Sequence, residues 1–424
     1  MINSELICGE QGEITMKKKG FGANFTLLAA GQGLSLLGNS VLDLALSMYV
    51  LEHTGSASVY GALLAAAMLP GILLAPLGGV LADRADRRRL MVWLDLLNGG
   101  VVLLTLPFLQ GAGGVAAAGV LMILLGVLGA VETPVVQASL PQAVEAGSLE
   151  RANAVVLQIS MLSAMVGPAL GGILFRVFGV APLLLLCGVC FWITAMLERL
   201  IRLEPLEQVP ASGGLLQTVF DDLSESGRFL RREQPALLSL VGFTAAMALL
   251  CNGVAGVGAP FLTSTRLGLS ADWYGAAGSA LGAFGIAGSL AAGLLVGRMG
   301  GSRLAWVLVM MGGCLLPAGT MFLAGGGTMA CYGTLVAAFC GMQLCAVVFS
   351  VFARSVVQRR VPGRMMGKLM ALAAALEACG QPVGQLIYGF LFDVCPAGWV
   401  LLITGLLMVM LGIIGRGVLA TLKL

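Results

Sequence analysis

The chain has 424 residues, of which 58% are hydrophobic and only 11% are charged, and its formal net charge is +3. Soluble domains carry about 25% charged residues, so this composition excludes a soluble globular protein and indicates a polytopic membrane protein. The small net charge gives no sign of nucleic acid as a partner; the expected surroundings are a lipid bilayer.

Long apolar segments predict an all-α membrane protein with twelve transmembrane helices. A helix needs about 20 apolar residues to cross a bilayer, at a rise of about 1.5 Å per residue. A polar cytoplasmic tail, residues 1–23, precedes the first span, and either Met1 or Met16 can be the start of the chain. The predicted spans are residues 24–51, 60–80, 90–109, 115–137, 154–175, 181–200, 236–262, 273–297, 304–323, 329–351, 369–391 and 398–419.

The basic residues lie almost entirely on one side of these spans. Of the 24 Lys and Arg residues, 22 fall in the two tails or in the loops after even-numbered spans, and only Arg176 and Arg266 fall on the other side. Because basic loops stay in the cytoplasm, we expect both termini to be cytoplasmic. An error of one span would abolish this asymmetry, so it also supports the count of twelve.

The connection between the sixth and seventh spans divides the chain in two. We expect an N-terminal six-helix bundle over residues 24–200, a cytoplasmic linker over 201–235 and a C-terminal six-helix bundle over 236–424. Within the linker, apolar residues recur at helical spacing from Leu215 to Leu230, which predicts an amphipathic helix. This helix either lies at the membrane surface or packs on the bundles.

The connection between the second and third spans holds the densest charge cluster of the chain. Its pattern, G-x-L-x-D-R-x-x-R-R from residue 79 to residue 88, resembles the signature loop of the major facilitator superfamily. In that family this loop latches the cytoplasmic ends of the two bundles; the alternative is a generic positive-inside loop. Asp95, near the start of the third span, is the expected partner of its arginines. The resemblance implies a latch that includes Gly79, Asp83, Arg84, Arg87 and Arg88.

Other stretches resemble the drug-proton antiporter branch of this superfamily, which includes macrolide-efflux-type proteins. Gly167, Pro168 and Gly171 resemble the helix-five motif of antiporters, and residues 223–232 and 358–368 resemble the branch's central-loop helix and its tenth loop. The resemblance runs from the first span to the last. It implies two bundles of six helices and a bacterial inner (plasma) membrane location. The span 115–137 lacks the buried arginine that many proton-driven exporters carry there.

Three carboxylates within the spans are candidates for binding a proton or another cation. An ionisable group in the membrane costs about 2.5 kcal/mol or more, so it is a functional hypothesis by default. Asp43 in the first span is the first candidate, and its alternative role is a packing hydrogen bond to Asn39. Glu132 lies two residues before Pro134, where it can instead satisfy backbone groups through water.

The third carboxylate, Glu377, belongs to a polar stripe. Glu377, Gln381 and Gln385 share one face of the eleventh span at a spacing of four residues. We expect this face, with Asn39 of the first span, to line a central substrate cavity.

The residues lack the motifs of the main rival classes. No GxxxxGK[ST] loop for ATP occurs, no nucleophile–base pair is evident, and His53 is the single histidine, so we expect neither an enzyme, a cofactor nor a metal site. The sequence therefore predicts a monomeric secondary transporter that exports a lipophilic or amphipathic small molecule in exchange for protons (or Na⁺). The alternatives are a lysophospholipid or siderophore mover, an importer of the same fold, or a membrane structural or sensing protein that does not transport.

Overall fold

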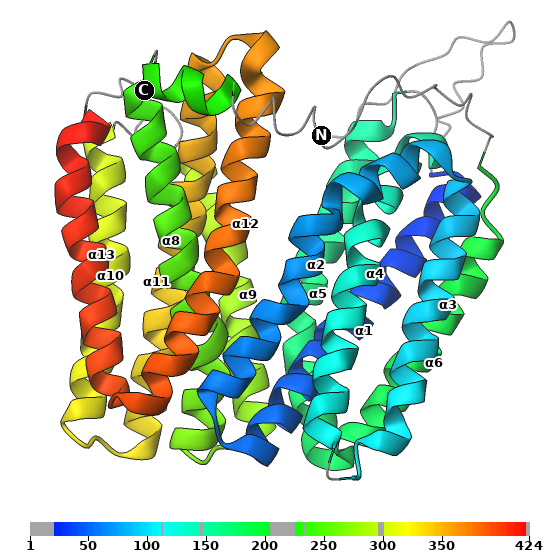
Figure 1. Cartoon of the computed structure of the whole chain (residues 1–424), viewed down its shortest axis with the longest axis horizontal. Coiled ribbons are helices and arrows are strands. Elements are labelled where there is room, and N and C mark those ends of the chain that lie inside the picture. The colour runs from blue at the N-terminus through cyan, green and yellow to red at the C-terminus, as the bar shows by residue number, and fades with distance from the viewer. Residues whose placement is uncertain are drawn as a thin grey trace, which may run out of the picture.

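The computed structural model of the protein consists of twelve long helices in two bundles of six (Figure 1). It describes residues 21–111, 113–144, 147–203, 225–232, 234–295 and 301–420, and this part contains no strand. The N-terminal bundle comprises α1 (Ala23–Thr54), α2 (Ala57–Arg84), α3 (Arg87–Thr105), α4 (Gly114–Ala143), α5 (Leu149–Phe178) and α6 (Val180–Arg199). The C-terminal bundle comprises α8 (Pro235–Pro260), α9 (Ala271–Leu294), α10 (Gly301–Leu323), α11 (Thr328–Arg360), α12 (Gly363–Val394) and α13 (Ala397–Ala420).

The prediction of twelve membrane helices is confirmed. Eleven of the described helices are long and apolar enough to cross a membrane. The remaining one, α12, has 32 residues; its hydropathy is lowered by the polar stripe of Glu377, Gln381 and Gln385. The seventh predicted span differs in detail, because α8 ends at Pro260 and a π-helical turn, η2 (Phe261–Arg266), follows it.

Glycine and capping residues set the tight turns between neighbouring helices. Gly55 ends α1 with a φ of 61°, a left-handed conformation that costs glycine nothing. The Ser56 hydroxyl then accepts a hydrogen bond from the backbone N–H of Val59 (3.2 Å) and caps α2. In the same way Asp86 caps α3 by accepting from the N–H of Arg89 (3.1 Å). The local sequence is thus sufficient to place these helix starts.

The two bundles diverge toward one side of the molecule and converge toward the other (Figure 1). We call the side on which α1 begins and α13 ends the termini side. Contacts between the bundles form on the opposite side, where α2 packs on α12 and α5 packs on α9. The structure is therefore closed on the opposite side and parted on the termini side.

Part of the linker between the bundles is also described. Residues 225–232 are helical, and the Leu230 side chain is fully buried in the hydrophobic core. The Glu225 carboxylate pairs with the Lys368 ammonium of α12 at 2.5 Å. This part of the predicted amphipathic helix packs on the C-terminal bundle; its remainder, from Leu215 to residue 224, lies outside the described residues, as does most of the N-terminal tail.

Candidate functional site

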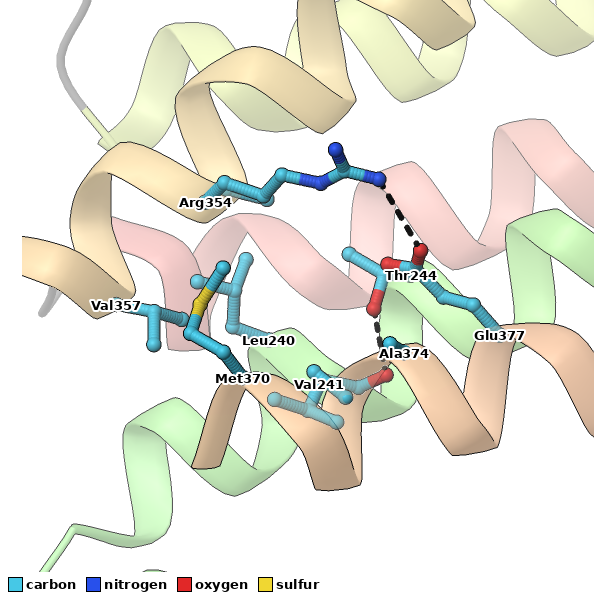
Figure 2. A pocket seen from close by; sticks show the side chains of 10 residues that line it. Leu240, Val241, Thr244, Arg354, Val357, Met370, Ala374 and Glu377 are labelled. Atoms are coloured by element: carbon cyan, nitrogen blue, oxygen red, sulfur yellow. Dashed lines mark hydrogen bonds and ion pairs between the residues drawn. The ribbon is translucent and has the colours of Figure 1, made fainter. Parts of the chain in front are cut away.

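A cavity of about 300 Å³ lies inside the C-terminal bundle, in its termini-side half (Figure 2). Three helices, α8, α11 and α12, line it. Its walls are mostly apolar, with two charged groups: the Arg354 guanidinium lies 3.6 Å from the Glu377 carboxylate. The other lining residues include Leu240, Thr244, Val357 and Met370.

The polar stripe of α12 leads from this cavity to the contact between the bundles. Glu377 is one quarter exposed at the cavity. Gln381 is half-buried one turn further on. Gln385 is buried beside Gly256 of α8, and its side-chain carbonyl oxygen has no hydrogen-bond donor among the described residues. The stripe thus ends at Gln385, whose buried carbonyl oxygen lacks a donor, in the part of α12 that packs on α2.

Asp43 lies on α1 and is exposed. It interacts electrostatically with two tyrosines, Tyr60 of α2 and Tyr274 of α9 in the other bundle. Its backbone carbonyl accepts a hydrogen bond from Ser47 (2.6 Å), whose hydroxyl also bonds the Tyr60 hydroxyl (2.7 Å). Among the described hydrogen bonds none joins Asp43 to half-buried Asn39, so the packing role considered for Asp43 has no contact to support it.

The contact that closes the opposite side is built twice. Residues 56–62 and 270–276 both read S-A-x-x-Y-G-A and begin α2 and α9. Residues 389–394 and 172–177, at the ends of α12 and α5, both read G-x-L-F-x-V. In each copy a start of the first kind packs on an end of the second kind, in the other bundle.

The close approach in both copies depends on glycine. A methyl group on Gly61 would lie 2.4 Å from the carbonyl oxygen of Gln385, and one on Gly275 would lie 2.3 Å from that of Pro168. Ordinary contacts between such atoms are longer than 3 Å. Backbone therefore meets backbone across the bundles at both places, as small residues allow in membrane helices.

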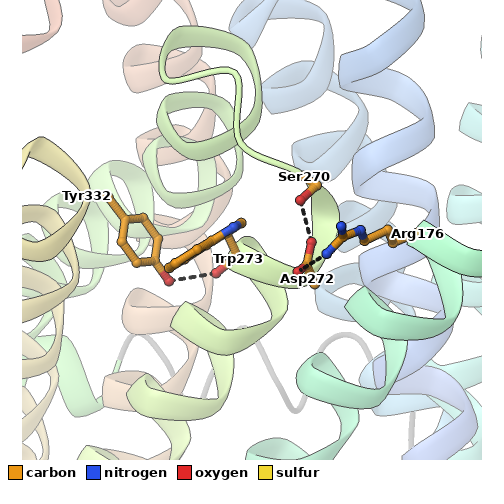
Figure 3. A network of polar contacts seen from close by, with 5 residues as sticks. All are labelled: Arg176, Ser270, Asp272, Trp273 and Tyr332. Atoms are coloured by element: carbon orange, nitrogen blue, oxygen red, sulfur yellow. Dashed lines mark hydrogen bonds and ion pairs between the residues drawn. The ribbon is translucent and has the colours of Figure 1, made fainter. Parts of the chain in front are cut away.

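Charged groups hold the two copies together in different ways. In one, the Arg176 guanidinium of α5 pairs with the Asp272 carboxylate of α9 at 2.8 Å, and Ser270 also donates to Asp272 (Figure 3). Next to this pair, the Tyr332 hydroxyl of α11 donates to the Trp273 carbonyl at 2.8 Å. The start of α9 is thereby bonded both to α5 of the N-terminal bundle and to α11 of its own bundle.

In the other copy a carboxylate binds a helix N-terminus. Asp393 of α12 accepts hydrogen bonds from the Ser56 hydroxyl (2.6 Å) and from the backbone N–H groups of Ala57 (2.8 Å) and Ser58 (2.9 Å). These groups open α2, so the carboxylate also meets the positive end of the helix dipole. Sequence reasoning missed both copies, although the repeated S-A-x-x-Y-G-A was a signal for them.

The helix-five motif serves both kinds of packing. Gly167 and Gly171 face α1 within the N-terminal bundle, where a methyl on Gly167 would lie 2.4 Å from the Ser40 hydroxyl. Pro168 faces α9 instead, and the backbone N–H of the next residue, Ala169, donates to Ser279 of α9 at 3.0 Å. The motif therefore packs on α1 within its own bundle and also on α9 of the other bundle.

The signature loop binds within its own bundle in this conformation. Arg87 donates to the carbonyls of Ala82 (2.7 Å) and Ala138 (2.6 Å), and Arg88 to that of Ile201 (3.4 Å). Gly79 has open space around its Cα. The side chains of Asp83 and Arg84 lie outside the described part. The latch between the bundles stays a prediction, and here the loop ties α2, α4 and the end of α6.

Asp95 does not lie where it was expected. The residue is 2% exposed, and its carboxyl group lies within hydrogen-bonding reach of the Glu198 carboxyl of α6. Glu132 of α4 is close by, and accepts hydrogen bonds from Asn98 (2.9 Å) and Ser35 (3.5 Å). The structure thus gathers three acidic residues inside the N-terminal bundle, away from Asp43 and from Glu377. Glu198 was missed because it ends a span, where charged residues are common.

Comparison with known proteins shows which family and which structures the chain is similar to. The sequence profile of the Major Facilitator Superfamily matches residues 28–385. The chain is 23% identical to macrolide efflux protein A of Streptococcus pyogenes over 401 residues, 92% of this chain and 94% of that protein. It is 29% identical to the multidrug efflux pump Tap of Mycobacterium tuberculosis over 184 residues, 42% of each chain. The inward-facing crystal structure of a bacterial homologue of the iron transporter ferroportin superposes with a TM-score of 0.68 at 19% identity, over 92% of this chain and 98% of that one.

Proposed function

Because the chain belongs to the Major Facilitator Superfamily and is a membrane transporter rather than an enzyme, we propose that it exports a lipophilic or amphipathic small molecule in exchange for protons. The observation that carries this proposal is the one-sided closure of the bundles. Two copies of one contact hold them together on the opposite side, while they part on the termini side. A protein that rocks between this state and its reverse exposes a central site to each side in turn.

The direction and the class of substrate rest on two further observations. Relatives that align with the chain include a macrolide efflux protein and a multidrug efflux pump, which supports export. The mostly apolar cavity between α8, α11 and α12 suits a lipophilic body, and Glu377 beside Arg354 offers a partner for a polar or cationic group. By sequence, 22 of the 24 basic residues fall in the tails or in the loops after even-numbered spans, which supports a cytoplasmic location for the termini side. The cavity lies in the termini-side half of its bundle and would then lie toward the cytoplasm.

Proton exchange would act through Asp43. Its carboxylate interacts electrostatically with Tyr60 and Tyr274, the tyrosines of the two repeated helix starts, so its charge can affect the closed contact. Proton binding and substrate binding at a shared site bias the same equilibrium between two states.

Purified protein in liposomes with a pH-sensitive dye inside tests the proposal. A panel of lipophilic drugs and lysolipids is added under an imposed proton gradient. Proton flux that depends on a drug, and that is lost in Asp43→Asn, is the expected result. Drug or lysolipid movement that ignores the gradient would contradict proton exchange and favour a facilitator or lipid mover. Proton flux evoked by lysolipids but by no drug would move the cargo to that class.

A further inference from the structure

The acidic cluster of the N-terminal bundle has more hydrogen-bond acceptors than donors. Asp95, Asn98 and Glu198 are each at most 3% exposed, and Glu132 is half-buried. The described donors to this cluster are the Asn98 amide and the Ser35 hydroxyl, and both bond Glu132. Three buried oxygens, one each on Asp95, Asn98 and Glu198, have no donor among the described residues. A buried acceptor without a donor costs about 1–3 kcal/mol.

The negative charges of the cluster also indicate that it needs a positively charged ligand. The Asp95 and Glu198 carboxyl groups are in hydrogen-bonding reach of one another, and Glu132 acts electrostatically on both. The charged groups that act on Asp95 and Glu198 are one another and Glu132, all of them acidic. Two ionised carboxylates cannot share a buried site without strong repulsion, so such pairs hold a proton between them.

We infer that Asp95 and Glu198, with Glu132 and Asn98, form a proton-binding site inside the N-terminal bundle. A proton on one carboxyl of the pair converts it into an O–H donor to the other and removes one negative charge. One proton therefore supplies a donor within the Asp95–Glu198 pair and also lowers its negative charge. A metal ion fits less well, since no three acidic, cysteine or histidine side chains of the described residues converge on a point that could hold one.

The position of the site indicates how a proton reaches it. Asp95 lies on α3 and Glu198 in the last turn of α6, whereas Glu132 lies on α4 and is bonded to Ser35 of α1. Each helix that contributes a side chain packs on two of the others: α1 packs on α4 and α6, and α3 packs on α4 and α6. Half-buried Glu132 is the least enclosed of the acids, so a proton enters or leaves there. It passes to the pair past Asn98, which bonds Glu132.

The role of this proton as the exchanged ion rests on the proposed function, but its presence does not. Infrared spectroscopy of the purified protein detects the C=O stretch of a protonated carboxyl, which shifts in D₂O. We expect such a band in the unaltered protein at neutral pH, and its loss in Asp95→Asn and in Glu198→Gln. Each variant leaves a hydrogen-bonding amide opposite the remaining acid, so one serves if the other fails to fold. Glu150→Gln, at an exposed position in the first turn of α5, should keep the band.

The outcomes separate the site from the transport mechanism. A band that is absent, or that survives both substitutions, would overturn the proton site. A band that disappears when NaCl replaces a sodium-free buffer would also overturn it, with Na⁺ as the occupant. In liposomes, we expect substrate-dependent proton flux to fall to the leak rate in the variants while substrate still moves down its own gradient. Unaltered protein that shows the band but no such flux would instead refute proton exchange and leave the site standing.

Discussion

Asp393 is predicted to hold the transporter closed on the opposite side, and its replacement by asparagine should shift the conformational equilibrium. The carboxylate accepts three hydrogen bonds of 2.6–2.9 Å from the first residues of α2, across 335–337 residues of chain. Asparagine keeps one acceptor oxygen at this place but loses the charge and the second acceptor. When the bundles part on this side, all three bonds break, so the loss falls on the closed state alone.

The size of the shift follows from the kinds of bond lost. A hydrogen bond to a charged group contributes about 1.5–3 kcal/mol, and a charge at a helix N-terminus about 0.3–1 kcal/mol. The Asp393 side chain is exposed, so solvent weakens both and a total of about 1–2 kcal/mol is reasonable. Since 1.4 kcal/mol is tenfold, the ratio of closed to open molecules should fall about 5- to 30-fold.

Distances between spin labels can measure this ratio. Gly111 and Ala324 are exposed on the opposite side, one in each bundle, and can be replaced by cysteine to carry the labels. The exposed native Cys379 is first replaced so that it is not labelled. We expect Asp393→Asn to increase the long-distance population. The control is Glu52→Gln, an exposed carboxylate near the same side that accepts no described hydrogen bond. A distance distribution in Asp393→Asn identical to that of the unaltered protein would show that this contact does not hold the bundles together.

Three further predictions concern the interface and the cavity. Gly275→Ala should open the same side, because the added methyl group would lie 2.3 Å from a carbonyl oxygen of α5. The control, Gly293→Ala, adds a methyl group in open space and should leave the bundles closed; the same spin-label distances measure both variants. Asp43→Asn should abolish proton-coupled export but leave the melting temperature unchanged; normal coupled export would exclude its role. Glu377→Gln should weaken the binding of cationic drugs, measured by equilibrium dialysis. It should cost less than about 1 kcal/mol of stability, because its partner Arg354 is 61% exposed. An unchanged affinity of the variant for cationic drugs would argue against a cation site at Glu377.

The sequence alone was sufficient to determine the membrane helices. Their number and approximate positions follow from the length of each apolar segment, because bilayer thickness sets that length locally. It also predicted Asp43, Glu132 and Glu377 as candidate sites, since a charge inside a span stands out against its neighbours. The helices mainly exceed their predicted spans at the ends, as in α11, which runs from Thr328 to Arg360 rather than over 329–351. Beyond the hydrocarbon, hydropathy no longer marks where a helix stops.

Only the tertiary structure decided which of these groups meet. Asp95 looked like a partner for the arginines beside it in sequence, but α3 turns it toward Glu198 on α6, 103 residues further on. Asp393 and Arg176 lie near the ends of α12 and α5, and in the structure they bind the starts of α2 and α9 in the opposite bundle. Membrane insertion depends on each segment separately, whereas such pairs depend on how packed helices are rotated and paired. That arrangement follows from contacts over the whole chain, such as Gly61 on Gln385. The repeated S-A-x-x-Y-G-A marks Gly61 in the sequence, but it does not say which helix packs on it.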